Sequence, residues 1–245
     1  MFFLDDLGQA AASVQAACMQ LILARQINGH AVPSVVTFLA ATNRRQDQAG
    51  VSGILEPVKS RFKSIIELQV EVNDWVKWAI KNNMPAELTA FVRFKPTVLE
   101  GTGLSKDIVN TSNPRTIANV GIQQANNLPK ELYQEVFEGA AGPAFATEYM
   151  TFLEIMDKLP SIDSILSDPD GAKVPKELSI MYCITGALAR KMDDKTIQPI
   201  VRYLNRLKPE FAVACMADGT TKNPKVCQNK AYIDWAVKHK QLLAA

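Results

Sequence analysis

Two short, almost wholly apolar runs lie near the start of the chain, at residues 2–4 and 35–41. Apolar runs of this length, separated by a helix, are typical of strands buried in a parallel sheet. The spacing of apolar residues between them predicts a helix from about Ala11 to Arg25. Asn28-Gly29 then predicts a tight turn inside a small hairpin. The sequence therefore predicts an α/β segment at this end of the chain.

Polar and helical patterns follow the second apolar run. Residues 43–53 are polar and contain glycine, which predicts an exposed loop. A short helix is expected over Ile54–Arg61, and a third strand over Ser64–Leu68. From Asn73 onward the pattern contains no convincing strand, and prolines separate a series of predicted helices. These helices are expected at residues 73–83, 86–94, 114–126, 130–138, 144–159, 176–192, 197–207 and 231–243. The predicted fold is thus an α/β piece to about residue 70, followed by an all-helical remainder.

Length, net charge and cysteine content exclude some classes of protein but do not identify one. The 245 residues suit one large domain or two smaller ones, and a net charge of +2 gives no case for nucleic-acid or acidic-membrane binding. The four cysteines form no CxxC pair, so reduced cytosolic thiols are expected rather than a zinc site. No stretch is apolar enough over a sufficient length to span a bilayer. The chain opens directly on a core strand, from which we expect that a segment belonging upstream is missing.

The first apolar run ends in two acids, Asp5 and Asp6. Parallel sheets gather their chemistry at the carboxyl ends of their strands. There, one acid could bind hydrated magnesium beside a nucleotide, and the other could orient or deprotonate the attacking water. The alternative is that Asp6 caps the following helix or faces solvent.

Two further polar residues occupy positions where they could act on the same nucleotide. Asn43 follows the second apolar run, so its amide could hydrogen-bond both water and a terminal phosphate; the alternative is a turn-forming Asn. Arg61 could meet phosphate oxygens with its planar guanidinium, and the alternative is a surface Arg in a loose ion pair.

The order and spacing of these residues resemble an AAA+ ATPase of the MoxR-like, dynein-related group. FFLDDLGQAAASVQAACMQLILARQINGHAV resembles that family's Walker B strand, following helix and hairpin. FLAATNRRQDQAGVSGILEPVKSRF resembles its sensor 1 strand, loop and arginine-finger helix, and NPRTIANVGI resembles its sensor 2 segment. The resemblance is strong to about residue 125 and weaker through VRYLNRLKPEFAVAC and AYIDWAVKHKQLL.

The resemblance implies a role for each matched residue. Asp5 matches the magnesium-associated acid, and Asp6 matches the catalytic acid, which is usually Glu in the family. Asn43 matches sensor 1, Arg61 the arginine finger and Arg115 sensor 2. The implied cofactors are ATP and Mg²⁺. Since Arg115 follows Pro114 at a helix start, the helix amino terminus and the guanidinium are both expected to face phosphate oxygens.

The resemblance also implies a domain division and a function. Residues 1–70 would form the second half of the AAA+ core, 71–128 a helical lid and 129–245 a helical extension. Family members form rings that couple ATP hydrolysis to remodelling of protein partners, so a homo-oligomeric ring and a protein substrate are expected, with a cytoplasmic location.

The phosphate-binding motif of the family does not occur in the sequence. No G-x-x-x-x-G-K-[ST] is present in the 245 residues, so the backbone cradle for phosphates and its Lys are not encoded here. We therefore interpret the chain as the carboxyl-terminal part of an ATPase that is inactive alone. The alternative is a non-enzymatic helical adaptor or assembly module attached to a decayed ATPase half.

Overall fold

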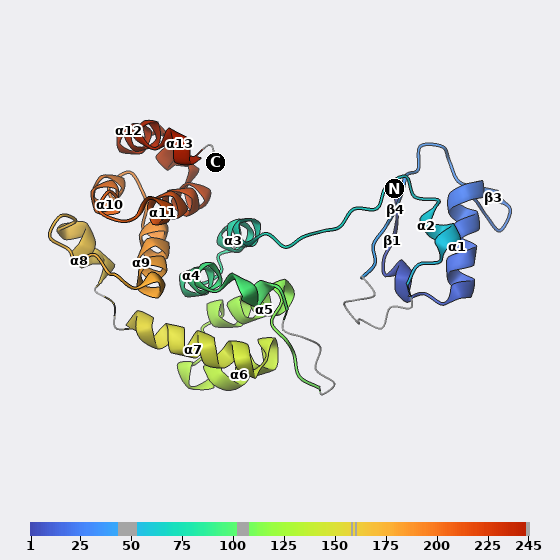
Figure 1. Ribbon diagram of the computed structural model, residues 1–245, viewed down its shortest axis with the longest axis horizontal. Helices are drawn as coiled ribbons and strands as arrows, with labels where there is room; N and C mark the ends of the chain where they lie inside the picture. Colours follow the sequence, from blue (N-terminus) through green and yellow to red (C-terminus); the bar gives the residue numbers. More distant parts are fainter. Residues whose placement is uncertain (44–52, 102–107, 158, 160, 244–245) are drawn as a thin grey trace. The chain divides into compact units, whose positions relative to one another are not determined.

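The computed structural model describes residues 1–43, 53–101, 108–157, 159 and 161–243 (Figure 1). It is mostly helical, with a small parallel sheet. The chain divides into two compact units, Met1–Leu68 and Gln69–Ala245, and each is described by itself. In the described residues no helix combines the length and the apolar character that a membrane crossing requires.

The first unit contains the predicted parallel strands. β1 (Phe2–Leu4) pairs with β4 (Phe38–Ala40), with Phe2 opposite Phe38 and Leu4 opposite Ala40. The rings of Phe2 and Phe38 stack with centroids 5.9 Å apart. Between β1 and β4 the chain forms the short helix η1 (Leu7–Gln9), helix α1 (Ala12–Ala24) and then a small hairpin. The parallel pairing and the intervening helix confirm these predictions, although β4 is shorter than the predicted run.

The predicted hairpin is also confirmed. β2 (Gln26–Ile27) and β3 (His30–Ala31) pair antiparallel around Asn28-Gly29. Asn28 and Gly29 have φ of 47° and 79°. A two-residue turn with both φ values positive matches the right-handed twist of the flanking strands, and Asn-Gly adopts it at low cost.

The predicted third strand at Ser64–Leu68 is wrong. After α2 (Glu56–Lys59) the chain runs through residues 64–71 without regular structure. Ile65, Ile66 and Leu68 are 75%, 85% and 94% exposed. The segment has the composition of a strand, but a strand forms only when a neighbour satisfies its backbone groups. No strand among the described residues takes that place, since β1 and β4 pair only with each other.

The second unit, Gln69–Ala245, is built from helices. Most of the predicted helices are confirmed, with ends that differ by a few residues. The sequence prediction missed η3, α8, α11 and η5. The bounds are α3 (Val72–Lys81), α4 (Ala86–Phe94), η3 (Pro96–Leu99), α5 (Pro114–Ala125), η4 (Lys130–Leu132), α6 (Tyr133–Ala141), α7 (Pro143–Asp157), α8 (Ile162–Ser167), α9 (Leu178–Arg190), α10 (Ile197–Leu204), α11 (Pro209–Lys222), η5 (Pro224–Gln228), α12 (Lys230–Lys238) and α13 (Lys240–Leu243).

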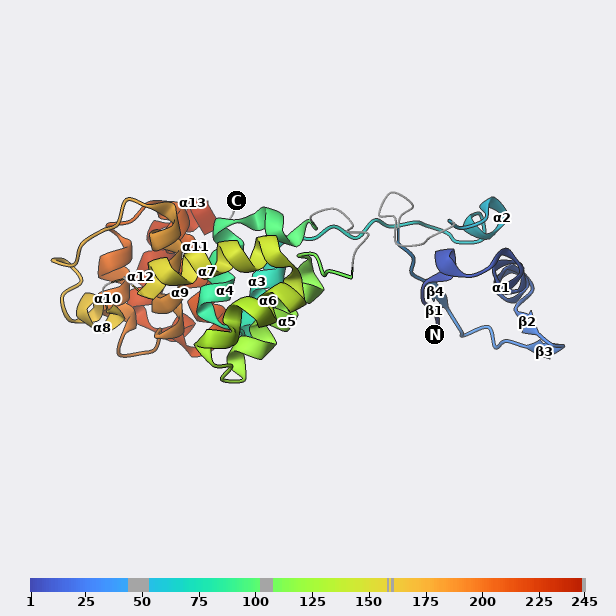
Figure 2. The same cartoon turned by 90° about the horizontal axis from the view of Figure 1, so that it is seen from below.

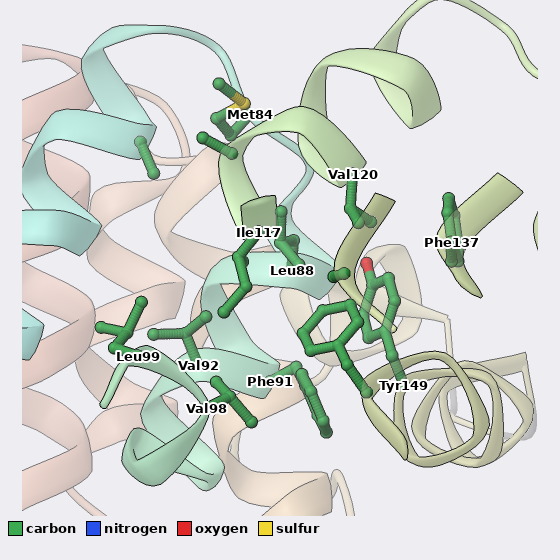
Figure 3. Packing of buried hydrophobic residues seen from close by; sticks show 14 of the residues in the cluster. Met84, Leu88, Phe91, Val92, Val98, Leu99, Ile117, Val120, Phe137 and Tyr149 are labelled. Carbon is green, nitrogen blue, oxygen red and sulfur yellow. The ribbon is translucent and has the colours of Figure 1, made fainter. Parts of the chain in front are cut away.

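Two hydrophobic clusters hold the helical unit together. The first is formed by α3–α7 with η3, and Figure 3 shows Phe91 and Tyr149 within it. The ring of Phe91 contacts those of Phe145, Tyr149 and Phe152. The second joins α8–α12 around Leu188, Ile200 and Tyr203. Helices α6 and α7 thus share a core with α3–α5, and Cys183 of α9 also belongs to this first cluster. The predicted functional division between lid and extension at residue 128 stays a prediction.

Helix α9 lies beside both α4 and α11 (Figure 2). A Cβ at Gly219 of α11 would lie 2.3 Å from Sδ of Met192, just after α9, so a larger residue there would require this flexible side chain to shift. Arg93 of α4 forms an ion pair with Asp218 of α11, with Nη2 2.5 Å from Oδ1. The helices of both clusters are therefore joined by a buried charged contact as well as by apolar packing.

Candidate functional site

The carboxyl ends of β1 and β4 bring the two predicted polar pairs to one edge of the sheet. Beyond the strand register, the Ala41 N–H donates to the Leu4 carbonyl at 2.9 Å. The Leu7 N–H then donates to the Ala41 carbonyl at 3.0 Å. Asp5 and Asp6 are therefore held in a short connection directly beside Ala41, and Thr42 and Asn43 follow from that point.

Both acids at this edge are exposed, and their backbone geometry distinguishes them. Asp6 has φ of 50°, in the left-handed region, where Asp is better tolerated than most side chains. Its N–H donates to Oδ1 of Asp5 at 3.1 Å. Asp6 occupies the N-cap of η1, but its side chain makes no capping hydrogen bond. Helix capping therefore does not explain Asp6, whereas the solvent-facing alternative fits its exposure.

Asn43 is exposed at the end of the described part of this segment. The Thr42 hydroxyl donates to the Asn43 carbonyl at 3.2 Å. The predicted polar loop continues through residues 44–52, which lie outside the described residues. Asn43 thus shares the sheet edge with Asp5 and Asp6, as the sequence predicted.

Arg61 lies in the turn after α2 and is exposed. Its N–H donates to the Val58 carbonyl, and its guanidinium donates to the Ser60 hydroxyl at 2.9 Å. Val58 of the same helix is fully buried, which anchors α2 within the first unit. Arg61 therefore lies on the surface, which is compatible both with binding phosphate oxygens and with a loose surface ion pair.

A residue that the sequence analysis did not single out, Gln15, fixes the approach to α2. It is buried on α1, and its Nε2 donates to the carbonyls of Ala10 and Gly53, both at 3.0 Å. Its Oε1 accepts the Leu55 N–H at 2.9 Å. One feature of the sequence could have pointed to Gln15: it is the one amide side chain in the first turns of α1, which are otherwise rich in alanine and apolar residues. Gln15 therefore links α1 to the segment that leads to Arg61.

Replacing Gln15 with Leu should release this segment. The substitution leaves two carbonyls and one N–H without their partner, which costs about 1–3 kcal/mol per buried group. We expect the Leu55 amide to lose hydrogen-exchange protection, while amides of α9 stay as protected as in the parent. The exposed Gln20→Leu on the same helix is the matched control. Equal protection of Leu55 in the parent and Gln15→Leu would show that the amide does not hold this segment.

A second unpredicted anchor, Arg25, positions β4. Its Nη2 donates to the carbonyls of Pro33 and Val36, both at 2.7 Å. The guanidinium also lies over the Phe38 ring, 5.4 Å from its centroid. The hairpin is thereby tied to the strand that leads to Asn43, which explains how so short a strand keeps its place.

Arg115 belongs to the helical unit, so its place relative to the sheet edge is not defined. It is exposed in the first turn of α5, and the Trp75 indole donates to the carbonyl of neighbouring Pro114 at 3.1 Å. Asn113 Oδ1 accepts the N–H groups of Arg115 and Thr116 at 3.0 and 3.1 Å, and Thr116 completes a capping box. The helix's own cap therefore occupies the backbone N–H groups of Arg115 and Thr116. That the helix amino terminus and the guanidinium face phosphate oxygens stays a prediction.

The donor set at the sheet edge fits a hydrated magnesium ion rather than a metal enclosed by protein. Among the described residues no group of three or more His, Cys, Asp and Glu side chains could hold a metal. Mg²⁺ keeps several waters and often binds through one or two carboxylates plus substrate phosphates. Asp5, with Asp6 beside it, can supply such a ligand, but the phosphate contacts would have to come from elsewhere.

The two buried cysteines of the helical unit, Cys183 and Cys215, have a packing role. All four cysteines of the chain are free thiols. Burial raises the pKa of Cys183 to about 12 and also raises the pKa of Cys215. Thiols that resist ionisation are poor nucleophiles and metal ligands, so these two serve packing.

Comparisons with known proteins identify no family for this chain. Family models, curated proteins and solved structures were each searched, and no match was found.

Proposed function

We propose that this chain is the carboxyl-terminal part of a MoxR-like AAA+ ATPase and that it acts in ATP-driven remodelling of a protein partner. The observation that carries the proposal is the sheet edge. β1 and β4 are neighbouring parallel strands, and the Asp5-Asp6 and Thr42-Asn43 pairs follow them at the same end. The order of the motifs along the chain adds the resemblance to that family.

Each residue then has a role that its position permits. Asp5 would hold the hydrated magnesium ion, and Asp6 would orient the attacking water and accept its proton. Asn43 hydrogen-bonds that water and a terminal phosphate oxygen. Bound ATP with Mg²⁺ would supply the phosphoryl group that is transferred.

The two arginines are proposed to act through charge. Arg61 is exposed after α2, so it could reach the nucleotide of a neighbouring subunit in a ring and stabilise the transition state. Arg115 would report the nucleotide state to the helical unit through its guanidinium at the start of α5. Ring assembly, a cytoplasmic location and the protein substrate belong to the same proposal.

The composition of the first unit's core supports a partial α/β domain. Among its described residues the buried apolar side chains are Leu7 and Val58, while Phe2, Phe3 and Leu39 are about half exposed. Apolar strands with open edges call for further strands. A segment with the phosphate cradle would supply both those strands and the missing anion contacts.

The purified chain should not hydrolyse ATP at a measurable rate. Positioning of the transferred phosphoryl group provides most of the catalysis in this chemistry, and its cradle is not encoded in the 245 residues. The measurement is Mg²⁺-dependent phosphate release at saturating ATP, with Asp5→Ala as the comparison. Turnover that Asp5→Ala abolishes would overturn this part of the proposal.

One observation favours a second candidate, a helical adaptor or assembly module. The unit Gln69–Ala245 contains both hydrophobic clusters, so the well-packed part of the molecule is the helical part. The DNA before the Met1 codon separates the two candidates. An in-frame G-x-x-x-x-G-K-[ST] there supports the ATPase, and its absence supports the adaptor.

A further inference from the structure

A small, partly enclosed cavity lies where four helices of the second unit meet. Its volume is about 20 Å³, which is room for one water molecule and too little for an organic ligand. Ile80 of α3 and Thr89 of α4 line it together with residues of α9 and α11. Because α9 packs against both α4 and α11, the walls belong to one packed body. The cavity therefore lies among helices that belong to both hydrophobic clusters.

Two polar side chains in the lining are buried. Thr89 and Asp218 are 5% and 7% exposed. The Thr89 hydroxyl donates to the Ala86 carbonyl at 2.9 Å. A hydroxyl has one proton to donate and two lone pairs, so Thr89 can still accept a hydrogen bond.

One carboxylate oxygen of Asp218 is left for the cavity. Oδ1 accepts from Arg93 Nη2 at 2.5 Å, whereas none of the described residues donates a hydrogen bond to Oδ2. Among the described residues the fully sealed side-chain atoms without a partner are Arg93 Nε, Gln123 Oε1 and Trp235 Nε1. Oδ2 of Asp218 is not one of them, so it keeps accessible surface, and the cavity is the space that this buried residue lines. A carboxylate oxygen in this position calls for a donor.

Arg190 and Lys222 add donors to the same lining. Both side chains are exposed, and both bind the connection between α3 and α4. Arg190 donates to the Met84 carbonyl, and Lys222 Nζ donates to Asn83 Oδ1 at 2.8 Å. An ammonium group has three N–H donors and a guanidinium has five, so each retains donors for a further acceptor. The cavity is therefore lined by acceptors from buried residues and by donors from exposed ones.

We propose that this cavity binds one ordered water molecule, which joins α4 to α11 beside the Arg93–Asp218 ion pair. The water donates to Asp218 Oδ2 and to the Thr89 hydroxyl, and it accepts from Lys222 Nζ. Three hydrogen bonds are typical of a buried water.

The mixed charge of the lining favours water over a monatomic ion. A halide would meet the Asp218 carboxylate, and a metal cation would meet the charged groups of Arg190 and Lys222. Water suits both sides of the cavity because it donates and accepts. The inference concerns the helical unit and does not depend on the ATPase proposal.

The test is water–protein cross-relaxation in NMR spectra of the full chain. It is observed at the α protons of Gly186 and the methyl group of Ala189, which both line the cavity. A water that stays bound while the protein tumbles gives a negative nuclear Overhauser effect, and we expect this sign at both residues. Relaxation dispersion of the water oxygen gives the residence time, and it excludes exchanging hydroxyl or ammonium protons as the source.

Thr89→Val and Thr185→Val are matched substitutions. Both threonines are buried, and both hydroxyls donate to a carbonyl of their own helix, which for Thr185 is that of Met181 at 2.8 Å. Thr89 lines the cavity and Thr185 does not. Thr89→Val should shorten the residence time of the water about fivefold, because one hydrogen bond is lost. Thr185→Val should leave it unchanged.

Lys222→Met tests the donor to the water at an exposed position, where the risk to folding is small. It should shorten the residence time about tenfold, since hydrogen bonds to charged groups are stronger. Lys225→Met, an exposed change on η5 outside the cavity, is the matched control and should leave the residence time unchanged.

Three results would overturn the proposal. The first is the absence of a negative effect at Gly186 and Ala189 in the parent. The second is an equal residence time in Thr89→Val and Thr185→Val, or in Lys222→Met and Lys225→Met. The third is an effect that strengthens when sulfate replaces chloride in the buffer, since the cavity would then hold a halide. Backbone resonances away from the cavity report whether each variant is folded.

Discussion

Replacing Asp218 with Ala is expected to destabilise the helical unit by about 3–5 kcal/mol. Asp218 of α11 and Arg93 of α4 have side chains that are only 9% and 13% exposed, and their charged atoms lie 2.5 Å apart. Arg93 also donates to Asn73 Oδ1 at 2.9 Å, while its Nε is buried without a partner. Removing the carboxylate would leave a buried guanidinium charge without its counter-ion.

The pKa of Asp218 shows how the effect of burial compares with the attraction between Asp218 and Arg93. Burial raises the pKa of the Asp218 carboxyl, and Arg93 beside it opposes that rise without cancelling it. The cost of removing the Asp218 carboxylate from water therefore outweighs its attraction to Arg93. As a result, the intact pair adds little to the free energy of unfolding, whereas removing one partner lowers that free energy strongly. Replacing both residues together, as Arg93→Met with Asp218→Leu, should recover most of the stability that Asp218→Ala loses.

Urea unfolding followed by tryptophan fluorescence measures these differences. The matched control is Asp170→Ala, which breaks an ion pair with Arg202 whose side chains are both 56% exposed. Exposed pairs contribute about 0–1 kcal/mol, so the control should unfold near the parent midpoint. Similar midpoints for Asp218→Ala and Asp170→Ala would contradict the assignment of Arg93–Asp218 as a buried ion pair.

Asp6→Asn should lower ATP turnover about 100-fold or more in a protein completed with a phosphate-loop segment, while ATP binding is retained. The amide keeps the size of the carboxylate but cannot accept a proton from water. Asp6 is well placed for such a role, since it is exposed at the sheet edge and its side chain makes no capping hydrogen bond. Phosphate release and equilibrium nucleotide binding separate the two effects.

Replacing Asp6 with the longer acid Glu tests its catalytic role more specifically than Asp6→Asn does. If the short reach of Asp6 limits the rate, Asp6→Glu should raise turnover above that of the parent. Glu56→Gln on α2, an exposed change in the same unit, should leave turnover unchanged. Turnover in Asp6→Asn equal to that in the parent would assign Asp6 to the solvent-facing surface and remove it from the proposed site.

Local signals predicted much of this fold. The Asn28-Gly29 turn, the helix α1 and the parallel strands β1 and β4 all follow from residues close in sequence or from short apolar runs. Helix α11 was missed because Phe211 and Met216 are the only large apolar side chains on its described buried face. The other apolar residues there, Ala212, Cys215 and Gly219, are small and carry a weak apolar signal. They are buried there because α9 approaches closely, and sequence spacing does not reveal that approach.

The sequence predicted the part of the candidate site that lies at the ends of the two parallel strands. Asp5, Asp6 and Asn43 share one edge because their strands are parallel neighbours. The roles of Gln15 and Arg25 were not predictable, since Gln15 Nε2 reaches Gly53, 38 residues away, and Arg25 binds carbonyls of a loop. The strand expected at Ser64–Leu68 failed for a related reason, because composition identifies a strand former but not its partner.

The hydrogen bond from Trp75 to Pro114 provides an optical probe of α5. Indole emission shifts when its N–H loses or exchanges a partner, and this N–H is bound to the carbonyl that directly precedes Arg115. The other two tryptophans have different surroundings, as Trp78 is partly exposed and Trp235 stacks on His239. A chain retaining Trp75 alone would therefore report, without any added label, each movement of the first turn of α5 against α3.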